Sequence, residues 1–161
     1  MILSVPGTHW NWYYDPQIYT IRPVPEIHVN RTAFERLVEK TLETLPPEYA
    51  GRLHNLVFLI EDWADPETLA EVGFDDPAEL LGFYNGTPLT ERSHDQIDPG
   101  PDRITLYHGA IDLEARLSGL PVRQVIRETL WHEIAHYFGF SEEEMDRIED
   151  FWADRNFPGS R

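Results

Sequence analysis

The sequence contains no cysteine, so disulfide bonds, thiolate metal sites and cysteine nucleophiles are all excluded. Basic residues are also scarce, because 13 Lys and Arg stand against 29 Asp and Glu and give a formal net charge of −16. Such a surface repels phosphate backbones and anionic lipids, so we expect neither nucleic-acid binding nor membrane binding. No apolar run reaches the roughly 18 residues that a membrane-spanning helix needs.

The residues that are present are sufficient for a folded domain. The chain has 161 residues, of which 41% are hydrophobic and 12% aromatic, and this composition argues against intrinsic disorder. The segment from Met1 to Gly7 has no basic stretch ahead of an apolar one, so we do not expect a secretory signal peptide. A cytoplasmic protein is therefore the default expectation, and nothing in the sequence indicates its oligomeric state.

Residues 1–29 differ from the rest of the chain. They are rich in aromatic residues and prolines and show little periodicity, apart from a short strand candidate over 18–21. We expect an aromatic N-terminal arm over 1–29 that packs on a domain over 30–157. The alternative is a partly disordered tail.

Hydrophobic periodicity predicts an alternation of helices and strands in the domain. A helix begins at Thr32 and Glu35, which have capping-box spacing, and ends at Pro46-Pro47. The continuous apolar run 56–60 predicts a buried strand. Further segments are a weaker strand over 80–84, a long polar loop over 85–102, a third strand over 103–108 and a short helix over 111–117.

The longest helical pattern runs from Pro121 to Phe138 and ends at Gly139, a residue suited to a left-handed helix terminus. A last amphipathic helix is expected after Ser141, which has capping-box spacing with Glu144. Its apolar face would carry Met145, Ile148 and Phe151.

The long helix contains the motif His132-Glu133-Ile134-Ala135-His136, or HExxH. Residues i and i+4 lie one above the other on a helix, so His132 and His136 can bind one metal ion together. Glu133 lies beside them, where it can act as a general base on water without binding the metal itself. Helical geometry places all three on the core-facing arc, where polar side chains need partners. The competing interpretation is an exposed polar face, or core histidines satisfied by hydrogen bonds.

A catalytic zinc site needs a third protein ligand. Gly139 allows the chain to reverse after the motif, and Glu142 follows three residues later as our candidate. It could instead be an ordinary acid at a helix N-terminus. Asp146 is the next candidate, and His108 and His94 compete, although we expect His108 to be a surface histidine. Two histidines and a carboxylate suit zinc.

The segment Trp131 to Gly139 resembles the signature of the small bacterial mini-zincin proteins, a predicted metallopeptidase family. Leu81-Gly82-Phe83-Tyr84-Asn85-Gly86 and Arg103 to Tyr107 are also similar to that family, and the resemblance covers about residues 31–150. It implies an α+β, minimal zincin-like fold in which a small, about three-stranded mixed sheet packs on the HExxH helix. It also implies His132 and His136 as metal ligands and Glu133 as general base. The family often has Asp where this chain has Glu142.

The first functional hypothesis is a zinc-dependent metallopeptidase that hydrolyses a peptide or protein substrate with a metal-activated water. Tyr107 or His108 could stabilise the oxyanion, and strand 103–107 could bind an extended peptide as an edge strand. The alternatives are a non-catalytic metal-binding or interaction module on the same fold and a metal-free structural protein. An intact Glu133 favours the peptidase, because a non-catalytic site does not need this acid.

Overall fold

The computed structural model describes residues 2–4, 11–15, 20–23, 27–92, 100–141 and 143–145. Its strands are β1 (Ile2–Ser4), β2 (Asn11–Asp15), β3 (Thr20–Pro23), β4 (Leu56–Glu61), β5 (Gly82–Asn85) and β6 (Asp102–Tyr107). Its helices are α1 (Arg31–Glu43), α2 (Pro47–Ala50), α3 (Pro66–Val72), α4 (His108–Ser118) and α5 (Val122–Phe138), with a 3₁₀ turn η1 over Leu89–Glu91. No helix among these residues is long and apolar enough to cross a bilayer.

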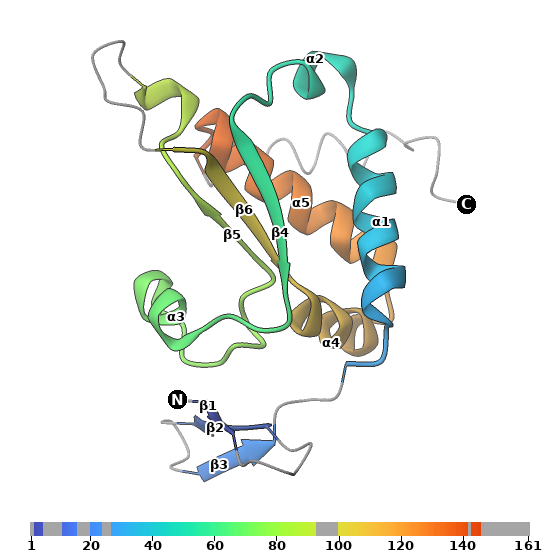
Figure 1. Cartoon of the computed structure of the whole chain (residues 1–161), viewed down its shortest axis with the longest axis vertical. Helices are drawn as coiled ribbons and strands as arrows, with labels where there is room; N and C mark the ends of the chain where they lie inside the picture. Colours follow the sequence, from blue (N-terminus) through green and yellow to red (C-terminus); the bar gives the residue numbers. More distant parts are fainter. Residues whose placement is uncertain are drawn as a thin grey trace.

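The domain is α+β, as the sequence predicts, and is built on a three-stranded mixed sheet (Figure 1). The strand order is β4-β6-β5, with β4 parallel and β5 antiparallel to β6. Residues of α1, α4 and α5 pack in one core cluster with one face of β6, whereas Leu69 of α3 packs with Tyr107 in a second cluster. Helix α5 therefore lies directly on the sheet. The rigid core holds the residues of α5 in place.

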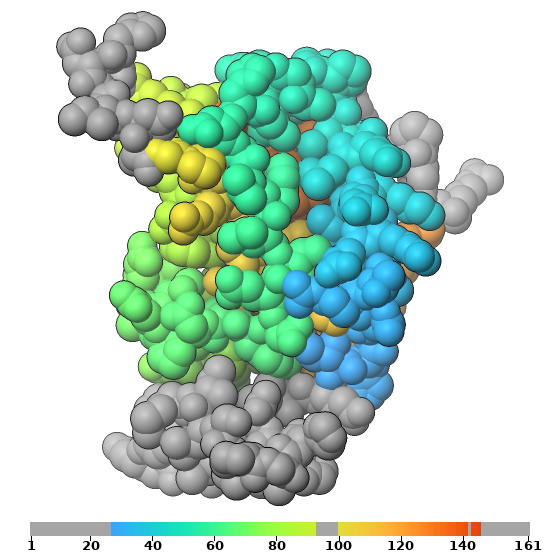
Figure 2. Space-filling view, in the orientation of Figure 1, coloured from blue at the N-terminus to red at the C-terminus, as the bar shows by residue number. Residues whose placement is uncertain are grey.

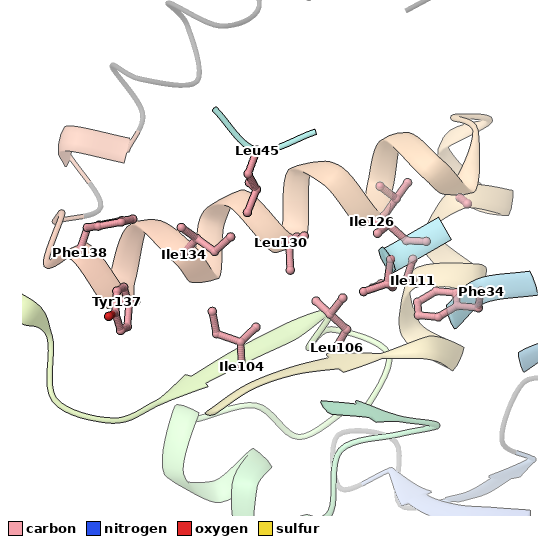
Figure 3. Packing of buried hydrophobic residues seen from close by; sticks show 13 residues of the cluster. Phe34, Leu45, Ile104, Leu106, Ile111, Ile126, Leu130, Ile134, Tyr137 and Phe138 are labelled. Atoms are coloured by element: carbon pink, nitrogen blue, oxygen red, sulfur yellow. The ribbon is translucent and has the colours of Figure 1, made fainter. Parts of the chain in front are cut away.

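The core between α5 and the sheet is apolar and closely packed. Ile104 and Leu106 of β6 point toward α5, where Leu130 and Ile134 meet them (Figure 3). All four side chains are at most 1% exposed. Burying one such side chain stabilises the fold by about 1.5–3 kcal/mol. This core fixes the helix that carries the HExxH motif.

Strand β4 is only half buried, so the expectation of a buried strand over 56–60 is wrong. Its side chains alternate between half-buried and exposed, and Val57 and Leu59 are 40% and 36% exposed. The physical reason is its position at the edge of the sheet, with the core on one face only. In the space-filling view, β4 contributes to the open surface beside α1 (Figure 2).

The N-terminal segment contains more strand than the sequence indicates. Strands β1, β2 and β3 pair antiparallel in the order β1-β2-β3. The short strand expected over 18–21 is found as β3, Thr20–Pro23, while residues 18 and 19 lie outside the described residues. The packing of the aromatic side chains of residues 1–26 also lies outside them, so that part of the arm interpretation stays a prediction.

The expected capping box at Thr32 and Glu35 is wrong, because α1 is capped by Asn30, two residues before Thr32. The Asn30 side chain accepts hydrogen bonds from the backbone N–H groups of Thr32 and Ala33, at 2.9 and 3.4 Å. Glu35 instead accepts a 2.9 Å hydrogen bond from Arg31 Nε. The capping box expected at Ser141 and Glu144 is present, with Ser141 N donating to Glu144 Oε2 at 2.8 Å.

Replacing Asn30 by Ala is expected to destabilise the protein by about 1 kcal/mol, because two N–H groups at the helix start lose their acceptor. Thr32→Ala is the matched control at the neighbouring exposed position, and we expect it to stay within about 0.5 kcal/mol of the wild type. Urea unfolding followed by circular dichroism measures both. A larger loss in Thr32→Ala than in Asn30→Ala would contradict this assignment of the cap.

Candidate active site

Helix α5, which carries the HExxH motif, has well-defined ends. The helix begins after Pro121, which has φ −60° and ψ 135° and serves as N-cap. It ends at Gly139, whose φ of 85° lies in the left-handed region and whose N–H bonds back to the last turn. Both ends agree with the sequence prediction to within one residue. The motif occupies the last two turns before Gly139.

The imidazoles of His132 and His136 converge on one point. Their Nε2 atoms are 3.2 Å apart, and the ring planes are nearly perpendicular, at 83°. Two nitrogens bound at about 2.0–2.1 Å to a tetrahedral zinc ion lie about 3.3 Å from each other. The observed separation therefore fits two ligands of one zinc ion, and both side chains are half-buried rather than enclosed.

Glu133 lies deeper than the two histidines, with only 6% of its surface exposed. It faces β5, because a Cβ atom built on Gly82 would lie 3.0 Å from Glu133 Oε1. Thr129, one turn earlier on the same face, is also buried. The helix thus places the histidines at the border of the buried face and the carboxylate within it, next to the sheet.

No third ligand joins the histidine pair within the part of the chain that the structure describes. There, no three His, Asp or Glu side chains lie close enough to hold one metal ion. Glu142, Asp146 and His94 lie outside the described residues. Glu142 as the third ligand therefore stays a prediction.

His108 is not a surface residue, so that expectation is wrong. It begins α4 directly after β6 and is 2% exposed. Its Nε2 lies 2.8 Å from the carbonyl oxygen of Val29, and its ring lies 4.4 Å from that of Phe34. The residue is buried because α1 and the segment before it cover the end of β6. These contacts hold His108 in the core, and the structure does not group it with His132 and His136.

Tyr107 does not lie on the α5 side of the sheet. Its ring is 2% exposed and belongs to the cluster with Leu69 and Leu80, under α3. Burial, followed by the negative charges of Glu61, Asp65 and Glu133, raises the pKa of Tyr107 to about 12. The hydroxyl therefore stays protonated near neutral pH. The role of Tyr107 as an oxyanion donor stays a prediction.

Gly82 is a site residue that the sequence reasoning did not single out. It is buried at the start of β5, and a Cβ atom built on it would lie within 3.0 Å of side-chain atoms of Thr129 and Glu133. The sequence contains a signal for this role of Gly82: a glycine inside a strand pattern often marks a place where another group approaches the backbone closely.

Comparison with known families settles the relationship of the chain. A family model described as zincin-like metallopeptidase matches residues 53–152. The chain belongs to the zincin-like metallopeptidase family. The match extends from the segment before β4 through α5, and so covers the whole mixed sheet and the HExxH motif of this zincin-like chain. No match was found among curated proteins.

Proposed function

We propose that this zincin-like protein is a zinc-dependent peptidase that hydrolyses peptide bonds with an activated water. The observation that carries the proposal is the 3.2 Å separation of the two Nε2 atoms, with Glu133 next to them in the sequence and buried against β5. A non-catalytic metal site would need the two histidines but not the carboxylate. Family membership supports the same reaction class.

Each residue of the motif has a distinct role in this proposal. His132 and His136 hold the ion, and Glu142 completes the ligand set. A bound zinc ion would supply Lewis acidity, which lowers the pKa of a coordinated water and polarises the substrate carbonyl. Glu133 accepts the proton of the attacking water and later delivers a proton to the leaving amine. Its burial protects this proton transfer from bulk solvent.

The strand that binds the peptide must differ from the one the sequence suggested. Strand β6 cannot accept a further strand, because it is central and pairs with both β4 and β5. Among the described residues, no strand pairs with the outer edge of β5, and Gly82 of β5 lies next to Glu133. We therefore place the substrate along β5 as an added strand, with main-chain hydrogen bonds fixing its register.

Metal content and cleavage test the proposal together. The full chain, purified without added metal, is analysed for bound zinc and then incubated with a peptide library with and without a chelator. We expect about one zinc ion per chain and cleavage that the chelator abolishes and added zinc restores. Bound zinc without cleavage of any library member would overturn the peptidase proposal in favour of a metal-binding module.

The aromatic arm is proposed to cover or border the active-site groove. It precedes a family match that begins only at residue 53. A deletion of the arm must end before His28. The side chain of Asp112, which is 1% exposed, accepts hydrogen bonds from the N–H groups of His28 and Val29. These two residues therefore belong to the domain and must be kept.

Deleting residues 1–26 is expected to raise the cleavage rate, or to speed the loss of zinc to a chelator, because the groove becomes more open. Peptide cleavage and chelator competition on the truncated and full chains measure this. A second variant, Trp10→Ala/Trp12→Ala in the full chain, removes two aromatic side chains of the arm without changing the chain length. A truncated protein that no longer folds would show that the arm is core structure, and unchanged rates would exclude a covering role.

A further inference from the structure

Gly82 is the first residue of β5 and lies opposite Leu106 of the central strand. It is buried, and the preceding residue, Leu81, accepts a 2.9 Å hydrogen bond from Tyr107 N. The backbone at this position is therefore held to the central strand β6, and a movement away from α5 would disturb this strand pairing.

The conformation of Gly82 does not itself require glycine. The described glycines with positive φ are Gly73, Gly100, Gly119 and Gly139, and Gly82 is not among them. Glycine is favoured at position 82 because there is no space for a side chain. A Cβ atom there would lie 2.8 Å from Thr129 Cγ2, 2.9 Å from Glu133 Cγ and 3.0 Å from Glu133 Oε1. Real Cβ atoms essentially never come within 3.0 Å of such neighbours.

We infer that Gly82 is a positioning residue for Glu133: its missing side chain leaves the space in which the carboxyl group lies between β5 and α5. The inference rests on the proposed function, since it concerns the residue we propose as general base. A side chain at position 82 would require the Thr129 methyl group and the Glu133 side chain to shift, and the flexible end of Glu133 is its carboxyl group. Proton transfer depends strongly on such placement, and a shift of about 1 Å can lower a rate by about 100-fold.

A purely structural role for Gly82 makes a different prediction. Overpacking would then lower stability without a specific effect on turnover. Gly86 provides the control, because it follows the other end of β5 and is even more crowded. A Cβ atom at Gly86 would lie 2.4 Å from Asp102 Cγ, which is not part of the proposed site.

The kinetic test compares Gly82→Ala, Gly86→Ala and Glu133→Gln in the zinc-loaded full chain, with the double variant Gly82→Ala/Glu133→Gln. We expect Gly82→Ala to lower kcat about 10- to 100-fold with zinc affinity within about threefold of the wild type. Gly86→Ala should keep kcat within about threefold. In the Glu133→Gln background, Gly82→Ala should cause no further loss. Equal fractional losses in both backgrounds, or wild-type kcat in Gly82→Ala, would overturn the inference.

A stability test works without any activity. Gly82→Ala should lower the urea midpoint of the wild type more than it lowers the midpoint of Glu133→Ala, because the truncated side chain no longer meets the new Cβ. Equal shifts in the two backgrounds would overturn the inference. Should Gly82→Ala fail to fold alone, Thr129→Ser removes the competing Cγ2 contact, and the same comparison is made in that background. A wild type that binds zinc but cleaves nothing would refute the proposed function, while the midpoint comparison would still decide whether Gly82 houses the carboxyl group.

Discussion

Glu133→Gln is expected to lower kcat by about 10²–10⁴-fold while zinc affinity stays close to that of the wild type. General-base assistance is worth about this much, and Gln keeps the size and shape of Glu but cannot accept the proton of the attacking water. The metal should stay bound because His132 and His136, whose Nε2 atoms lie 3.2 Å apart, are unchanged. Replacing a carboxylate that is only 6% exposed by a neutral amide should also leave the folded state intact.

Glu128→Gln is the matched control for charge removal on the same helix. Glu128 is exposed and accepts a 2.9 Å hydrogen bond from Gln124 Nε2, away from the motif. Peptide cleavage under saturating substrate and zinc titration measure both variants, and Glu128→Gln should behave like the wild type. Equal turnover in wild type and Glu133→Gln would show that this mechanism is wrong. Loss of zinc together with turnover would instead place Glu133 among the metal ligands.

The sequence predicts α5 and its motif well because their signals are local. Helix ends depend on a few neighbouring residues, and both Pro121 and Gly139 lie where the pattern places them. The convergence of His132 and His136 follows from the i, i+4 spacing alone, once the segment is helical. The capping pair at Ser141 is local in the same way.

The order of the strands could not be predicted, because it depends on pairing between distant segments. The apolar run in β4 is compatible with a central strand, yet β6 occupies the centre and β4 the edge. The strand order removes β6 as a peptide-binding edge, whereas Val57 and Leu59 are exposed because they lie on the face of β4 that points away from the core. Periodicity within one strand contains no information on which neighbours it acquires.

The sequence also contains local start and stop signals for α3. Helix α3 begins with Asp65 as N-cap, which accepts hydrogen bonds from the N–H groups of Glu67 and Thr68, and ends at Gly73 with φ 80°. Pro66 at the first helical position completes a typical start signal. The burial of His108 is different, because it results from contacts with Val29, 79 residues earlier in the chain, and with Phe34 of α1.

The His132→Ala/His136→Ala double variant is expected to lose specific zinc binding altogether. A tetrahedral site that keeps only one carboxylate ligand cannot compete with water for the ion, because imidazole nitrogens supply most of the affinity in the proposed set. In the wild type, a ligand at 1,000 times its dissociation constant stabilises the folded state by about 4.1 kcal/mol, so zinc should raise the unfolding midpoint clearly. The double variant should show no such rise, although its metal-free stability should be close to that of the metal-free wild type, since both histidines are only half-buried.

Zinc titration by calorimetry and thermal unfolding with and without zinc measure this difference. His54→Ala is the matched control, because His54 is an exposed histidine outside α5 and its backbone N–H, which bonds the Tyr137 hydroxyl at 3.1 Å, is kept. It should bind one zinc ion with wild-type affinity. Each single variant, His132→Ala or His136→Ala, should weaken zinc binding strongly, because the two Nε2 atoms lie 3.2 Å apart and act on the same ion. Equal stoichiometry and affinity in the wild type and the double variant would show that the ion is held elsewhere, and the 3.2 Å approach would then be only the packing of two helical side chains.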